Sequence, residues 1–179
     1  MIPVRTEEET CEIRAAHCTI SDKPAFLGQI QEIAQKFKCR IICFNAEMLA
    51  GRTHAEAAVR CAARSCGAGR NISNTPEMEA LPYAAGSRQC HIATSFGPHT
   101  GENRLWICCY PVHEGIWSAL ESLVNVRVDD ISWERIDETK RKILIHHFAI
   151  TQEECDALEA GHTLVDLVVE RVVLLQITR

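Results

Sequence analysis

The sequence predicts an α/β (α+β) fold: a small mixed, mainly antiparallel sheet of about four strands covered by about seven helices. Segments of strand-like and helix-like periodicity follow one another along the chain. Apolar residues make up 46% of the chain and charged residues 24%, close to the average of globular proteins. No linker, repeat or break in composition divides it, so we expect one domain over residues 1–179.

The first elements are expected to be strand, helix and strand. Residues 11–20 and 38–45 are rich in β-prone side chains. Between them, apolar residues of the segment 25–37 follow the 4-3-4 spacing of an amphipathic helix. Asp22 suits the N-cap of this helix, and Pro24 suits its first turn.

A second helix is expected over residues 54–66. Thr53 and Glu56 have the spacing of a capping box, in which each side chain binds a free backbone amide at the helix start. Arg60 and Arg64, four residues apart, then lie on one face.

A third helix is expected to follow, with Asn74 or Thr75 as its cap and Pro76 in its first turn. Pro82 is expected to kink or shorten this helix, and Gly86 to end it. Residues 126–131 form either a short strand or a loop. The remaining expected elements are a short helix over 87–96, a buried strand over 104–110, and helices over 113–124, 137–148, 151–160 and 163–176, the last with a strand as the alternative.

Charge is unevenly distributed. The net charge of −5 argues against a protein that coats nucleic acid nonspecifically. Residues 51–70, however, hold four arginines against one glutamate, whereas residues 113–179 hold seven basic and thirteen acidic groups. A small basic patch on an acidic body fits a confined anionic contact; a solvated helix face is the alternative.

The ten cysteines allow three interpretations. A disulfide framework requires an oxidising compartment, and residues 1–10 show no signal peptide. The closest metal-like spacing, Cys39 and Cys43, lacks a second pair. The apolar neighbours of most cysteines favour small buried hydrophobes, with a metal site or a reactive thiol as alternatives. No apolar run approaches the roughly 20 residues of a membrane helix, so we expect a cytoplasmic protein without a membrane partner.

Catalytic motifs are absent from the sequence. It has no phosphate-binding loop, dinucleotide fingerprint, zinc-protease motif or nucleophile elbow. Asp129 and Asp130 are typical of a turn, although such a pair can hold a metal. His146 and His147 are neighbours on a predicted helix and so point in different directions. We therefore expect no catalytic residue, no metal ligand and no cofactor.

Six blocks of the sequence together carry a family resemblance. They are residues 44–51, 54–63, 71–74, 79–89, 150–154 and 167–172. In residue types and in order, these blocks resemble the TPRKB-like (CGI-type) small subunit of the KEOPS complex, in its archaeal form. Pro82 and Cys90 depart from the family pattern, which more often has an aliphatic residue and isoleucine at these positions.

The resemblance implies a non-catalytic subunit of a complex that makes threonylcarbamoyladenosine in tRNA. In that complex a transferase performs the chemistry, and a small atypical kinase or ATPase subunit regulates it. The small subunit binds this kinase and helps to capture tRNA through its single-stranded 3′ CCA end. The alternatives are a kinase-binding module without RNA contact and a metal-dependent enzyme with a Cys/His site.

Arginine suits a CCA end because it pairs with phosphates and stacks on unpaired bases. Tyr83 is expected either to stack on a base or to lie in the core. The expected tRNA-binding residues are Arg60, Arg64, Arg70, Asn71, Ser73, Asn74 and Arg88. The expected kinase-binding residues are Ile92, Leu164, Val168 and Leu175.

Overall fold

The computed structural model describes residues 11–71, 73–127 and 131–177, and it confirms the α+β fold with a four-stranded sheet. All strand pairings in this sheet are antiparallel, in the order β2-β3-β1-β4. The predictions that concern residues 1–10, Ile72, Asp129 and Asp130 fall outside the described residues. The strands are β1 (Glu12–Ile20), β2 (Arg40–Asn45), β3 (Gly101–Tyr110) and β4 (Asn125–Arg127).

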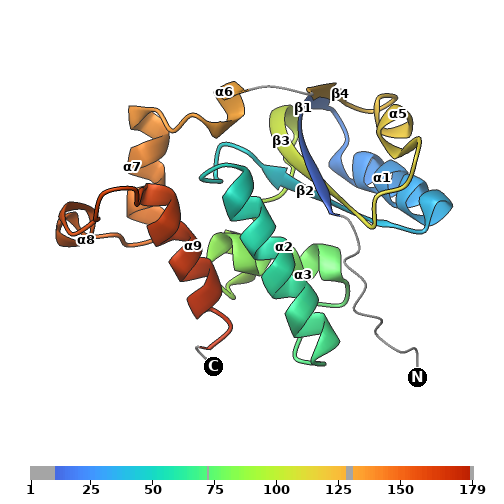
Figure 1. Cartoon of the computed structure of the whole chain (residues 1–179). Coiled ribbons are helices and arrows are strands. Elements are labelled where there is room, and N and C mark those ends of the chain that lie inside the picture. Colours follow the sequence, from blue (N-terminus) through green and yellow to red (C-terminus); the bar gives the residue numbers. More distant parts are fainter. Residues whose placement is uncertain (1–10, 72, 128–130, 178–179) are drawn as a thin grey trace.

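Helices cover both faces of this sheet (Figure 1). One face packs against α1 and α5, and the other against α2, α3 and α9. Within the described ranges there are nine helices rather than about seven. They are α1 (Lys23–Phe37), α2 (Arg52–Gly67), α3 (Pro76–Ala85), α4 (Cys90–Thr94), α5 (Ile116–Leu120), α6 (Ile131–Glu134), α7 (Glu138–His147), α8 (Gln152–Asp156) and α9 (Leu164–Leu174).

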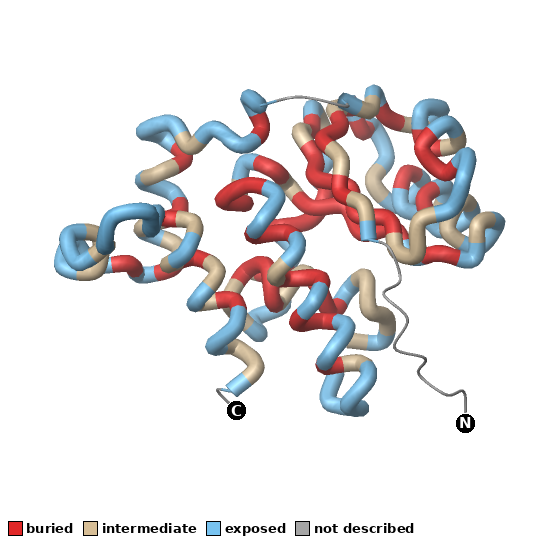
Figure 2. Tube along the Cα trace, in the orientation of Figure 1, coloured by how far each residue is buried: buried red, intermediate tan, exposed pale blue. Residues whose placement is uncertain are grey.

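Strand β3 lies inside the sheet and is buried on both faces, as its continuous apolar sequence predicts. Leu105 and Ile107 face the side of α1 and α5, whereas Trp106 and Cys108 face the side of α2 and α3. Figure 2 shows buried residues along the sheet and on the helix surfaces turned toward it. The sheet thus separates two apolar layers.

The predicted capping box at the start of α2 is wrong. The helix begins at Arg52 with Gly51 as its N-cap, and no side chain of the N-cap binds an amide. Instead, the distant Glu134 carboxylate accepts a hydrogen bond from the Arg52 amide, at 3.1 Å from Oε2. A contact across the fold therefore replaces the local cap.

The caps of α3 follow the prediction. Thr75 Oγ1 accepts a hydrogen bond from the Met78 amide, and Gly86 ends the helix in the left-handed conformation. Pro82 lies inside the helix, which ends three residues later. The helices predicted over 87–96 and 113–124 are shorter than expected, because α4 and α5 each consist of little more than one turn.

The cysteines are mainly core residues. All ten are free, and six of them are buried, which favours the interpretation as small hydrophobes. Among the described residues, no cluster of three or more His, Cys, Asp or Glu side chains has the arrangement of a metal site. No helix in the described part of the chain is long and apolar enough to span a bilayer.

Candidate nucleic-acid interface

Two of the predicted arginines converge at the C-terminal end of α2. Arg70 and Arg88, eighteen residues apart, line the same hollow of about 240 Å³. The other lining residues are Ser65 of α2, Tyr83 of α3 and Gln176, which follows α9. Three helices thus supply the walls of a small site with two cations.

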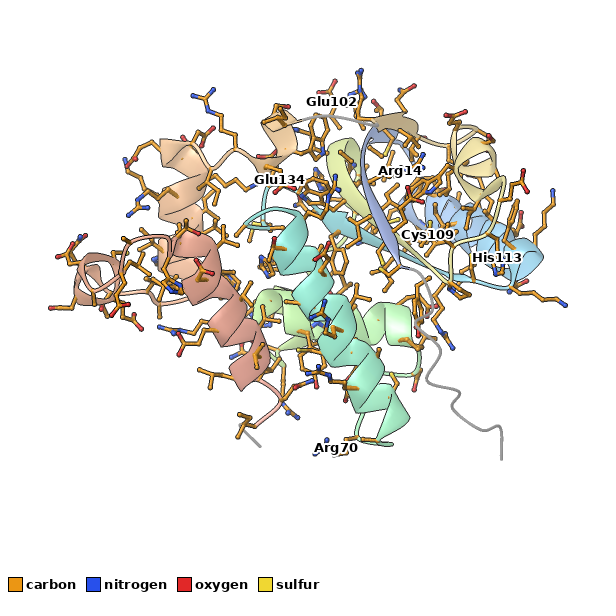
Figure 3. All side chains as sticks on the ribbon, viewed as in Figure 1. Arg14, Arg70, Glu102, Cys109, His113 and Glu134 are labelled. Carbon is orange, nitrogen blue, oxygen red and sulfur yellow. The ribbon has the colours of Figure 1, made fainter. Side chains whose placement is uncertain are left out.

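Arg70 is one of the two exposed cations of this hollow. It lies in the loop after α2, where its amide donates to the Ser65 carbonyl at 2.9 Å. Figure 3 shows Arg70 at the end of α2 that is farthest from the sheet. Its exposed side chain makes no hydrogen bond or ion pair with any residue that the structure describes. Its guanidinium is therefore available to a ligand.

Arg88 has a structural contact in addition to its place in the hollow. Its Nη2 donates to the Leu175 carbonyl at 3.1 Å, which ties the chain after α3 to the end of α9. A second contact fixes the same wall, because Gln176 Nε2 donates to the Cys61 carbonyl of α2 at 3.3 Å. The hollow is therefore held in shape before a ligand arrives.

Tyr83 lies in the core rather than on the surface. Its side chain is only 6% exposed, so the ring forms the floor of the hollow instead of an open stacking platform. This burial supports the core alternative of the sequence analysis.

Glu79 organises the loop beside the hollow, and sequence reasoning missed this role. Its carboxylate is 2% exposed and accepts hydrogen bonds from Ser65 Oγ at 3.1 Å and from the Ser73 amide at 2.8 Å. A buried carboxylate requires such partners. No local sequence pattern signals this burial, because the partners of Glu79 on α2 and in the loop lie fourteen and six residues away. Glu79 thus joins α2, the loop before α3, and α3 itself.

The predicted polar residues of this loop lie near the hollow but do not line it. Asn71 Nδ2 donates to the Ser73 carbonyl at 2.9 Å, which closes a local turn. The Ser73 amide is already bound to Glu79, and Asn74 is exposed just before the N-cap Thr75. The exposed amides of Asn71 and Asn74 remain available to a ligand at the rim.

Arg60 and Arg64 are exposed on α2 and outside the lining of the hollow. They stand one turn apart, and Arg64 belongs to the last turn of the helix. Both lower the pKa of the Cys61 thiol, although burial raises it overall. The two arginines therefore place positive charge on an exposed face of α2, and the structure does not bring them into the hollow.

The predicted kinase-binding residues divide into two groups. Leu164 and Val168 are 5% and 0% exposed, because they form the face of α9 that packs on the core, and they cannot offer a contact surface. Ile92 and Leu175 are half-buried against the same core. The exposed apolar residues of this region are Val173, Leu174 and Ile177.

Comparisons with known proteins identify no relative. No protein-family model matches the chain, and a search of curated proteins returns no match.

Proposed function

We propose that the chain is a non-catalytic subunit of a KEOPS-type complex that modifies tRNA with threonylcarbamoyladenosine. In this role it binds the single-stranded 3′ CCA end of tRNA and the small atypical kinase or ATPase subunit, and through the kinase it reaches the transferase. The family resemblance of the sequence is the basis for the complex. The convergence of Arg70 and Arg88 on one hollow is the observation that supports the RNA contact.

The hollow suits one small anionic or planar group. Cavities that enclose a drug-sized ligand measure roughly 300–1,000 Å³, so a site of about 240 Å³ fits a phosphate or part of a single base. Arginine binds phosphate with two parallel hydrogen bonds and stacks on unpaired bases. A flexible single strand can place such a group in a recess that a rigid duplex cannot enter.

The kinase surface is proposed at the end of α9. Val173 and Leu174 are each 40% exposed there, and Ile177 is 73% exposed. Arg88 and Gln176 tie this end to the hollow. A kinase bound to these residues would lie beside the captured RNA, which is the arrangement that tRNA recruitment requires.

The RNA contact is tested with Arg70→Glu, because the Arg70 side chain supports no other described residue. A charge-assisted hydrogen bond contributes about 1.5–3 kcal/mol, so we expect tRNA binding at fixed moderate salt to weaken about tenfold or more. Arg135→Glu makes the same charge change at an exposed arginine outside the hollow and serves as the matched control. Equal losses in both variants would indicate general electrostatics. Unchanged tRNA binding by the folded Arg70→Glu variant would show that the hollow is not part of the RNA-binding site.

A further inference from the structure

Strand β2 forms an edge of the sheet, and part of its backbone has no hydrogen-bond partner among the described residues. Antiparallel pairs alternate, so every second residue directs its amide and carbonyl away from the partner strand. The Ala46 amide donates to Arg104 of the β3 segment at 2.8 Å, whereas the Asn45 amide turns outward and donates to Phe96 at 2.7 Å. In the register that pairs Ile42 with Cys108, the backbone amides and carbonyls of Ile41 and Cys43 therefore point away from β3.

Ile41 and Cys43 lie between two residues of this edge, Cys39 and Asn45, whose amides already have hydrogen-bond partners. On one side, the Cys39 amide donates to the Ala34 carbonyl of α1 at 3.0 Å. On the other side, the Asn45 amide is bound to Phe96. The backbone groups of Ile41 and Cys43 bond no residue in the ranges that the structure describes. An unpaired edge of this kind is a template for another strand.

A cleft of about 910 Å³ runs along this edge, with α1 and α3 as its walls. Ile41 and Cys43 lie among its lining residues. Leu27 of α1 is 38% exposed and Met78 of α3 is 57% exposed, and both side chains line the cleft. Ile41 and Cys43 are only 4% and 8% exposed, so their unpaired backbone groups lie at the bottom of the cleft, between two apolar walls. An unpaired strand edge inside a groove is the arrangement that binds extended peptides.

The charged side chains of the cleft indicate the charge of the partner that it would bind. Its charged lining residues are Lys23, Lys38, Arg40 and Glu77. Arg40 Nη1 pairs with Glu77 Oε1 at 3.2 Å, and neither lysine has an ion pair with any described residue. This excess of positive charge favours an acidic segment. A second copy of the chain is disfavoured, because its own β2 would add Lys38 and Arg40 to the same cleft.

We propose that this cleft binds an extended acidic segment of a partner protein, with alternating acidic and aliphatic residues, as an additional strand on β2. The backbone of the segment pairs with Ile41 and Cys43, its aliphatic side chains face α3 and contact Met78, and its carboxylates face Lys23 and Lys38 at the two ends of α1. The proposal goes beyond the function given above, since the cleft and the arginine hollow share no lining residue.

The test is an NMR titration of the full chain with a blocked six-residue peptide of alternating glutamate and valine, at up to millimolar concentration. We expect the amide signals of Ile41 and Cys43 to shift and their hydrogen exchange to slow. The amides of Ile42 and Phe44 already bond to β3 and serve as internal controls. The corresponding lysine–valine peptide should bind at least tenfold more weakly.

Two variants distinguish peptide binding in this cleft from nonspecific peptide binding elsewhere on the protein. Met78→Asp changes an exposed cleft residue near the start of α3, where a carboxylate favours the helix, so the fold should persist. Ile143→Asp changes another exposed apolar residue outside the cleft, on α7, at 39% exposure. We expect binding to be lost only in Met78→Asp. Unshifted Ile41 and Cys43 amides, equal binding of both peptides, or equal losses in both variants would overturn the proposal.

Discussion

His54 connects three parts of the core through its two ring nitrogens. Nδ1 accepts from the Ala50 amide at 3.1 Å, so Nε2 must carry the proton that is donated to the Ala84 carbonyl at 2.8 Å. The ring packs edge-on against Phe96 and Phe148. These contacts use a neutral imidazole, and complete burial lowers the pKa of His54 to about 3.

The protein is therefore expected to lose stability in acid through His54. The unfolded chain binds a proton near pH 6.5, whereas the folded chain binds it only near pH 3. Between these values the unfolded state holds more protons, so the free energy of unfolding falls as the pH falls, by on the order of 5 kcal/mol at most. His54→Gln cannot titrate and should show a shallower pH dependence in denaturant unfolding. A His54 ring signal that titrates near pH 6.5 in folded protein would contradict this account.

At the scale of elements, sequence patterns predicted the positions of most strands and helices but not all of their ends. The spacing in α1 is local and appears as predicted, and the capping box that Thr151 and Glu154 form at the start of α8 is equally local. The start of α2 depends instead on Glu134, which is 82 residues away from its partner Arg52 in the sequence. Local periodicity contains no information about such a partner.

The end of α3 provides a test of backbone geometry. Gly86 has φ +58°, and an added Cβ would lie 3.1 Å from Phe148 Cε1. Gly86→Ala is therefore expected to destabilise the protein by about 1–3 kcal/mol, through the left-handed conformation and the close contact. Gly28, inside α1, has no atom within 4 Å of an added Cβ, so Gly28→Ala should stabilise by about 0.5–1 kcal/mol. Thermal unfolding of both variants measures these effects; a neutral Gly86→Ala would refute the packing described for this turn.

For the whole molecule, the sequence indicated which residues are basic but not which of them meet. Arg70 and Arg88 line one hollow because α2, α3 and α9 pack together, whereas Arg60 and Arg64 stay on the outer face of α2. Glu79 escaped prediction for the same reason, since its partners belong to other elements. Conversely, the apolar spacing of α9 correctly predicted a helix but could not separate its core face from its exposed residues.

The exposed end of α9 gives a prediction for the assembly. The double variant Val173→Asp with Leu174→Asp should lose binding to the KEOPS kinase of the same organism, because it places charges on the proposed contact surface. Ile143→Asp, on α7 and similarly exposed, should bind normally. Affinity is measured by calorimetry, together with thermal unfolding of each variant. Normal kinase binding by the folded double variant would place the interface elsewhere.

The central claim, capture of a tRNA 3′ end, is tested most directly by binding of the unmodified chain to intact tRNA and to the same tRNA without its CCA end. Both affinities are measured at one moderate salt concentration, since phosphate binding falls steeply with salt. The account predicts clear binding to the intact tRNA and its loss on trimming. Equal binding to both tRNAs, or binding to neither, would contradict it, and the second result would leave a kinase-docking subunit without RNA contact of its own.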